Sequence, residues 1–388
     1  MSGNFSIINS ENKRNHRWYA IGLVLLIFLP MIISYALFRY KPSFFYFRAW
    51  EYFPEVVYPN PKKLPVWKGY EKGDMSRPYF FRYQDEKYTY VSTDNDGFRR
   101  VPFSSDDYKV LVYGDSHCWG SRLSDSETFA WRLAEKLKQP VFNGGGRTIL
   151  TNLLARPDLN KARIIINVID AFHVRVVDMF PQDLTIGEYV PRNREVIPIA
   201  IKRFNPLSIL VQTLRRICHD LLIKNNLGTY MIGSNYIVPF SQGSLHQEYV
   251  ANNPLYADDF LTQVEGIARY SQGLRERGYT YVLVLVPRRD LIYGHPADDF
   301  SKEYFPEIIR ELERKGVYAV DLQDVFLAHR HEEPFFRTDT HWNAKGTEIA
   351  VAHVAEYLTQ KGIIRTSGIT AEKTAQRINP VQSLYGVQ

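Results

Sequence analysis

Short apolar runs alternate with longer amphipathic segments along the chain from Lys109 onward. An apolar run of about four to eight residues is typical of a buried strand, and a longer segment with one apolar face is typical of a helix. We expect strands at 109–113, 140–143, 162–169, 281–287 and 317–322. We expect helices at 127–138, 260–277, 302–314 and 344–360. This alternation predicts an α/β fold, in which a mostly parallel sheet is covered by helices on both faces.

One segment near the N-terminus is apolar all round. Residues 18–38 (WYAIGLVLLIFLPMIISYALF) are 21 residues without a charge, and at the helical rise they extend about 30 Å, the thickness of the hydrocarbon core of a bilayer. Pro30 is tolerable in a membrane helix. We interpret the segment as a transmembrane anchor; the alternative is a cleaved signal peptide, although no A-x-A site follows it.

The orientation of this helix is not fixed by its flanking charges. Lys13, Arg14 and Arg17 precede it and Arg39, Lys41 and Arg48 follow it, so the positive-inside rule gives a tie. A short polar N-terminus ahead of an anchor usually stays in the cytoplasm. We therefore expect the rest of the chain on the periplasmic, extracytoplasmic side of the inner membrane.

Composition narrows the class of partner. The formal net charge is +6, and the Lys and Arg residues are scattered, which suits anionic polymers or lipid headgroups and does not indicate a nucleic-acid site. The chain has two cysteines, Cys118 and Cys218. They could pair in an oxidising compartment, but two cysteines make no framework, and two free thiols are the expectation.

Ser116 is the first candidate for chemistry. In KVLVYGDSHCWGSRL an apolar strand ends at Gly114-Asp115-Ser116 and a helical segment follows. Catalytic groups of open α/β sheets lie beyond the carboxyl ends of the strands, so Ser116 is placed as a nucleophile would be. The alternative is a serine that caps the following helix.

The second candidate motif lies near the other end of the domain, in FFRTDTHWNAKG. Asp339 and His341 are two residues apart, so in extended backbone they point to the same side. The carboxylate can then accept a hydrogen bond from His341 Nδ1 and leave Nε2 facing a serine hydroxyl, as in a Ser-His-Asp triad. Turn and capping roles are the alternative.

Together these motifs resemble the SGNH (GDSL) hydrolase superfamily, over about residues 91–362. TDNDGFRR is similar to the lead-in of many bacterial members, and VFNGGGRT is similar to the second family block, with Asn143 and Gly145 at its positions. The resemblance implies a three-layer α/β/α fold and an oxyanion hole formed by the backbone N–H groups of Ser116 and Gly145.

The third family block departs from the pattern. The superfamily expects an oxyanion asparagine after a strand, whereas IIINVIDAFH brings Asp170 to that place. An ionised Asp170 cannot donate a hydrogen bond. Either another group, with Arg147 as the candidate, completes the hole, or the hole has backbone donors only. We expect Asp170 and Trp342 at the substrate pocket; for Trp342 a packing role is the alternative.

VLVPRRDLIYG, GVYAVDLQDVF and RTDTHWNAKG are similar to the alginate O-acetylase branch, membrane-associated enzymes that acetylate extracytoplasmic polysaccharides. In that branch the D-x-H-W motif precedes the serine, whereas here it follows. The resemblance implies a serine O-acyltransferase with a polysaccharide acceptor, no cofactor and no metal. If the chain is a transferase, we also expect a multi-spanning membrane acyltransferase as its partner, because a single anchor cannot itself carry acyl groups across the bilayer.

Two other functions remain open. An esterase or deacetylase would use the same triad with water as acceptor. A non-catalytic binding or assembly subunit would explain the unusual third block. HRHEE (329–333) has the composition of a metal cluster but lies in a polar stretch, so we expect a solvated loop.

The expected organisation divides the chain into five parts. Within the SGNH-like domain, residues from about 181 to 255 do not follow the alternation of strands and helices. We interpret them as an insertion that contains one amphipathic helix. The insertion is a lid, a membrane contact or a partner surface, or its helix simply packs on the core. The parts are a cytoplasmic N-terminus (1–17), the anchor (18–38), a linker and β-rich lead-in (39–105), the SGNH-like domain (106–365) and a C-terminal tail (366–388).

Overall fold

The computed structural model describes most of the α/β part of the chain and the N-terminal helix. The described residues are 5–40, 66–73, 86–103, 107–146, 149–170, 180–190, 210–211, 214, 230–232, 235–237, 260–287, 289–293, 301–337 and 339–364.

A five-stranded sheet forms the centre of the domain. Its strands are β3 (Val110–Gly114), β4 (Val141–Gly145), β5 (Ile164–Asp170), β8 (Thr280–Val286) and β9 (Tyr318–Asp321). They lie in the order β4-β3-β5-β8-β9, and every neighbouring pair is parallel. Each expected strand is confirmed to within two residues at either end, because an apolar run buried on both faces is characteristic of a parallel sheet.

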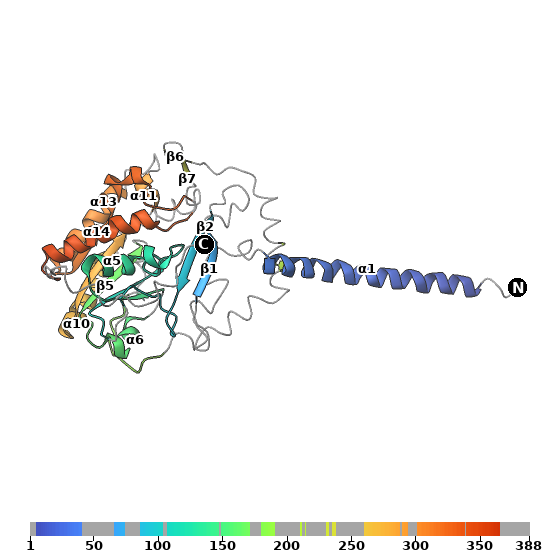
Figure 1. Cartoon of the computed structure of the whole chain (residues 1–388), viewed down its shortest axis with the longest axis horizontal. Coiled ribbons are helices and arrows are strands. Elements are labelled where there is room, and N and C mark those ends of the chain that lie inside the picture. The colour runs from blue at the N-terminus through green and yellow to red at the C-terminus, as the bar shows by residue number, and fades with distance from the viewer. Residues whose placement is uncertain are drawn as a thin grey trace, which may run out of the picture.

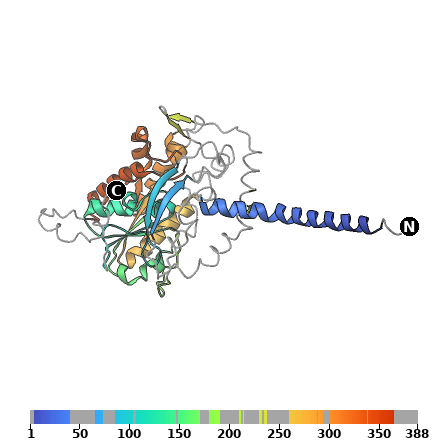
Figure 2. The same ribbon diagram turned by 45° about the vertical axis from the view of Figure 1, so that its right-hand side comes forward.

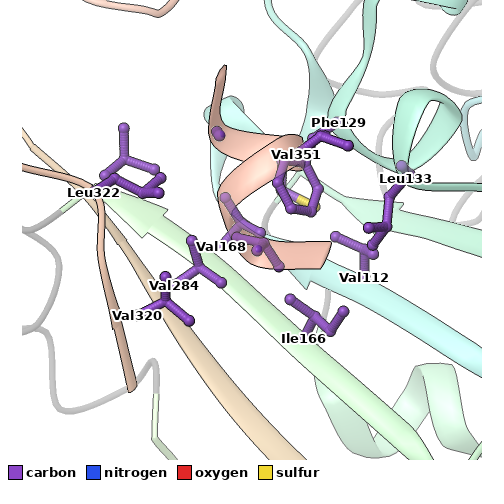
Figure 3. Close-up of a cluster of buried hydrophobic side chains, with 14 of the residues drawn as sticks. Val112, Phe129, Leu133, Ile166, Val168, Val284, Val320, Leu322 and Val351 are labelled. Carbon is purple, nitrogen blue, oxygen red and sulfur yellow. The ribbon is translucent and has the colours of Figure 1, made fainter. Parts of the chain in front are cut away.

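Two helical layers cover the sheet. Helices α5 (Phe129–Leu137), α13 (Gln323–Ala328) and α14 (Ala344–Gln360) contribute to one apolar cluster. In it Val112, Ile166, Val168, Val284 and Val320 of the sheet meet Phe129, Leu133 and Val351 (Figure 3). Helices α6 (Leu150–Leu154), α10 (Phe260–Glu276) and α12 (Ser301–Arg314) contribute to a second cluster with Leu111, Ile165 and Leu283. Alternate strand residues enter the two clusters, as the two-residue period of a strand requires.

The expected three layers and the four expected helices are therefore confirmed. Apart from the N-terminal helix, the other helical elements that have bounds in the described residues are short. They are α4 (Ser116–Trp119), α11 (Arg289–Tyr293) and the 3₁₀ turns at Asp125–Glu127, Pro157–Leu159 and Arg330–Glu332.

The N-terminal helix α1 (Phe5–Tyr40) projects away from the α/β body (Figure 1). Within it, His16–Leu37 is long and apolar enough to cross a membrane. Its large apolar side chains, including Leu23, Leu26 and Ile32, are exposed. Length, composition and this exposure fit an anchor, and a signal sequence has the same features.

A small antiparallel sheet lies beside the main one, as both views show (Figures 1 and 2). It pairs β1 (Val66–Lys72) with β2 (Glu86–Ser92). This sheet lies in the stretch expected to be a linker and β-rich lead-in, and a turn follows β2: the Gly97 N–H donates to the Asp94 carbonyl at 3.2 Å, and a bridge joins Thr93 to Arg99. The partner of β2 is β1, which falls in the stretch expected to be linker. Residues 74–85 of the same stretch lie outside the described residues.

The stretch expected to be an insertion is described only in part. Residues 180–190 run without regular structure, and β6 (Tyr230–Ile232) pairs with β7 (Asn235–Ile237) as a two-stranded antiparallel sheet. Most of the expected amphipathic helix at 207–224 lies outside the described residues, as does Cys218.

Candidate active site

The turn after β3 places Ser116 at the edge of the sheet. Gly114 has φ +146°, and a Cβ built on it would lie 1.9 Å from the carbonyl oxygen of Val168 in β5, so only glycine fits between the two strands. Asp115 then caps α4, since its Oδ1 accepts a hydrogen bond from the His117 N–H at 2.8 Å. Ser116 is the first residue of that helix.

Strand order explains why a site forms here. The chain goes from β3 outward to β4 and then returns past β3 to β5, so the direction of winding reverses between β3 and β5. Ligand sites of open α/β sheets lie at such a reversal, beyond the carboxyl ends of the strands. Ser116 follows β3, and Asp170 ends β5. The Asp115 Oδ2 atom accepts a hydrogen bond from the Asp170 N–H at 2.7 Å and joins the two strand ends.

The loop that carries Asp339 and His341 is held by its own backbone. The Phe336 N–H donates to the His341 carbonyl at 3.1 Å, and Phe335 bridges to Trp342. Asn343 then caps α14: its Oδ1 accepts from the N–H groups of the next turn, and its Nδ2 donates to the carbonyl of Phe335 at 3.1 Å. The base is thus presented from a fixed loop.

The structure brings Ser116, His341 and Asp339 together. The Nε2 of His341 lies 2.6 Å from the Ser116 Oγ, and its Nδ1 lies 2.5 Å from Asp339 Oδ1. Asp339 is fully buried and also accepts the backbone N–H of His341 at 3.0 Å. A carboxylate that fixes Nδ1–H leaves the Nε2 lone pair for the serine hydroxyl, so this arrangement can activate Ser116 as a nucleophile.

One predicted oxyanion donor, the backbone N–H of Gly145, already donates a hydrogen bond within the protein. The Gly145 N–H donates to Asn143 Oδ1 at 3.0 Å, so a developing oxyanion would compete with this hydrogen bond. Gly145 lies directly against α4, because an added Cβ would lie 2.4 Å from the Trp119 nitrogen. Asn143 is fully buried. Arg147 lies outside the described residues, and the roles of these groups remain predictions.

Trp342 lies in the core. It is fully buried, stacks on Phe129 with ring centroids 5.9 Å apart, and meets Phe326 at 6.3 Å. This position supports the packing alternative for Trp342. Because His341 directly precedes Trp342 in the chain, the packing of Trp342 also holds in place the loop that carries the base.

His117 is a site residue that the sequence did not single out. Its ring is buried between His341, at 4.7 Å between centroids, and Trp342, at 5.2 Å. Its Nε2 lies 3.6 Å from Asp170 Oδ2. The only signal in the sequence was its position directly after Ser116, which does not reveal that its ring turns toward His341.

Two other features with reactive side chains are Cys118 and the HRHEE segment. Cys118 is a free, buried thiol, and burial raises its pKa well above the ordinary value, so it is a poor nucleophile. Within the described part of the chain, no group of three or more His, Cys, Asp or Glu residues is arranged to hold a metal ion. His329 of the HRHEE segment instead pairs with Glu332 at 2.6 Å, and Glu332 also pairs with Lys345 at 2.8 Å.

A model of a known protein family matches part of the chain, toward its C-terminus. Residues 246–386 match the SGNH hydrolase-like domain of acetyltransferase AlgX. Residues 246–386 are therefore SGNH hydrolase-like. The matched region includes Asp339 and His341 and begins after Ser116.

Part of the chain is also similar to a probable O-acetylase. The probable alginate O-acetylase AlgJ of Pseudomonas syringae pv. tomato is 26% identical over 118 residues. The match spans 29% of this chain and 29% of the relative, well under half of either protein. The homology to AlgJ is therefore distant and partial.

Two solved structures are also similar to the chain. One is a protein of Slackia heliotrinireducens assigned to the SGNH hydrolases, 12% identical, with a TM-score of 0.31 over 65% of this chain and 99% of that one. The other is protein YXIM of Bacillus subtilis, 12% identical, with a TM-score of 0.32 over 72% of this chain and 69% of that one. Both TM-scores are low, and the α/β fold is seen directly in the five-stranded parallel sheet.

Proposed function

We propose that the chain is a membrane-anchored serine O-acyltransferase that moves acetyl groups onto hydroxyl groups of an extracytoplasmic polysaccharide. The observation that carries the proposal is the hydrogen-bonded series Ser116, His341 and Asp339 at the reversal point of the sheet. The match to the AlgX domain and the distant homology to AlgJ support acetyl as the acyl group and a polysaccharide as the acceptor.

The reaction has two halves. In the first, Ser116 Oγ attacks the carbonyl carbon of the acyl donor while its proton passes to His341 Nε2, and the protonated leaving group departs, which leaves acyl-Ser116. In the second half, His341 takes the proton of a sugar hydroxyl, whose oxygen attacks the acyl carbon. The proton then returns to Ser116 as the sugar ester leaves. Asp339 stabilises the imidazolium in both halves.

The proposed setting combines the N-terminal helix with the expectation that its short polar N-terminus stays in the cytoplasm. With α1 as an anchor in the inner membrane, the α/β body lies on the periplasmic side, where it meets a polysaccharide. A single helix provides no route for an activated acyl group across the bilayer. We therefore include a multi-spanning membrane acyltransferase as the partner that delivers the acyl group to Ser116.

Transfer is tested with the full chain purified in detergent. A chromogenic acetyl ester is the donor, and product is followed both as free acetate and as acetyl on added oligosaccharides, for wild type, Ser116→Ala and His341→Ala. Acetylated oligosaccharide that both substitutions abolish supports the proposal. Free acetate alone identifies an esterase, and turnover that survives in Ser116→Ala contradicts a serine mechanism.

A further inference from the structure

A short helix after β8 reaches the loop that carries the proposed base. Helix α11 lies in the sequence VLVPRRDLIYG and takes no part in the proposed mechanism. The Arg289 Nη2 atom donates a hydrogen bond to the carbonyl oxygen of Arg337 at 2.7 Å. The Tyr293 hydroxyl oxygen accepts a hydrogen bond from the Phe335 N–H at 3.2 Å. Both contacts fall on the backbone of one short segment, a few residues before His341.

Helix α11 is itself held by the core. Ile292 is buried in the apolar cluster that also contains Phe326 of α13 and Phe335. Arg289 and Tyr293 are four residues apart, so they lie on the same face of the helix. The Tyr293 ring also meets Phe335 nearly edge-on, with ring centroids 6.2 Å apart. The helix is therefore a fixed support from which two polar side chains reach the loop.

The two hydrogen bonds act on the segment that pairs with His341. They engage the N–H of Phe335 and the carbonyl of Arg337, on either side of Phe336. The Phe336 N–H in turn donates to the His341 carbonyl at 3.1 Å. A shift of this segment would therefore move His341, whose Nε2 lies 2.6 Å from the Ser116 Oγ.

Arg289 suits such a role because it is both charged and buried. Only 6% of the residue is exposed, and a charged group in such a place requires hydrogen bonds that offset its lost hydration. A guanidinium N–H that donates to a carbonyl makes a strong hydrogen bond of fixed direction. Burial raises the pKa of Tyr293 to about 12, so its hydroxyl group stays neutral at the pH of an ordinary assay.

We propose that Arg289 and Tyr293 are positioning residues, which hold the loop of residues 335–341 so that His341 stays within reach of Ser116. Each acts through the backbone of the loop and thereby on the alignment of the base. This inference rests on the proposed function, because it assigns a role beside the same triad. It does not depend on whether a sugar or water accepts the acyl group.

The expected loss is one of alignment. A displacement of a catalytic group by about 1 Å can lower the rate by about a hundredfold. Arg289→Met keeps a long side chain and removes its donors, so we expect kcat to fall by about tenfold to a hundredfold while KM is unchanged. Arg289→Lys restores one donor and should recover most of the loss. Tyr293→Phe removes a single oxygen atom, and its kcat should fall less.

The test is steady-state hydrolysis of p-nitrophenyl acetate by the full chain in detergent, with kcat and KM measured separately. Equal losses in kcat and kcat/KM identify an interaction that matters only in the transition state. Arg275→Met is the matched control, since the Arg275 Nη2 atom likewise donates to a backbone carbonyl, that of Gly316, at 2.5 Å. Gly316 precedes β9 and so lies at the opposite edge of the sheet from Ser116, and this variant should retain the wild-type kcat.

Hydrogen exchange tests the same inference without turnover. Release of the loop should speed exchange of the backbone amides of residues 333–343 in Arg289→Met and Tyr293→Phe, and should not do so in Arg275→Met. A wild type that hydrolyses no ester would contradict the proposed function, whereas unchanged exchange in both variants would contradict the positioning role.

The kinetics can also overturn the inference. A wild-type kcat in both Arg289→Met and Tyr293→Phe would mean that the loop keeps its position without them. A rise in KM with kcat unchanged would mean that Arg289 acts on the substrate and not on the loop. Should Arg289→Met not fold, Tyr293→Phe decides alone, because it keeps the ring against Phe335.

Discussion

The charge of Asp339 is the component of the triad whose contribution can be worked out from the structure. In Asp339→Asn the amide oxygen can still accept both hydrogen bonds that Asp339 Oδ1 receives, from the backbone N–H of His341 at 3.0 Å and from its Nδ1 at 2.5 Å. The orientation of the ring is then retained. What disappears is the negative charge that faces the imidazolium formed when Ser116 attacks.

The magnitude follows from Coulomb's law. The centres of a carboxylate and an imidazolium joined by this hydrogen bond are about 4 Å apart, and at an effective dielectric constant of about 20 they attract by about 4 kcal/mol. Since about 1.4 kcal/mol corresponds to a tenfold change in rate, we expect kcat to fall about a thousandfold. A change of tautomer, with the amide N–H turned toward Nδ1, would add to that loss.

The assay is steady-state hydrolysis of a chromogenic acetyl ester by the full chain, with thermal unfolding measured in parallel. Asp324→Asn is the matched control, because Asp324 is an exposed carboxylate in α13, and it should retain wild-type activity. A loss below tenfold in Asp339→Asn, with the unfolding temperature unchanged, would refute the reasoning that Asp339 stabilises the imidazolium.

Three further predictions concern stability. Gly114→Ala should destabilise the fold by about 3 kcal/mol or more in denaturant unfolding, since the added Cβ would meet the Val168 carbonyl. Gly266→Ala is the control: Gly266 lies in a helix with open space around it, so this variant should be more stable than wild type by about 0.5–1 kcal/mol. Leu133→Ala should cost about 2–5 kcal/mol in the same measurement, because Leu133 is fully buried; a cost under 1 kcal/mol would contradict the packing described. Burial raises the pKa of Asp321 to about 6, so its stabilising contribution is complete below the unfolded pKa of about 4 and is lost as the pH rises through 6. Asp321→Asn should therefore exceed wild type in stability by about 2–3 kcal/mol at pH 8 and by nothing at pH 3, and equal stability at both pH values would contradict the raised pKa.

The sheet and its helices could be predicted because each one buries a continuous apolar pattern. The run at Ile164–Asp170 has no polar face to expose, so a central parallel strand is its natural place. The strand Val66–Lys72 could not be found in this way. Its sequence VWKGYEK mixes charges with apolar residues, and it is a strand because β2 supplies its hydrogen-bond partners.

Some features of the site could likewise be predicted from local sequence patterns, and others could not. A strand that ends in Gly114-Asp115-Ser116 and a D-x-H loop before a helix are local patterns, and the sheet brings them together over 225 residues of sequence. The contact between His117 and His341 depends on how helix α4 packs against the loop that carries His341, and the hydrogen bond from Gly145 to Asn143 depends on the path of the backbone. Neither leaves a local pattern in the sequence.

The most direct test of the serine mechanism is to trap the acyl-enzyme. The full chain is mixed with an acetyl ester, quenched in acid within the first turnovers, digested, and mapped by mass spectrometry. The account predicts an acetyl group on the peptide that contains Ser116 in wild type, greater accumulation when the acceptor is omitted, and no such modification in Ser116→Ala. Turnover that continues in Ser116→Ala, with no acetyl group found on Ser116 of wild type, would contradict it.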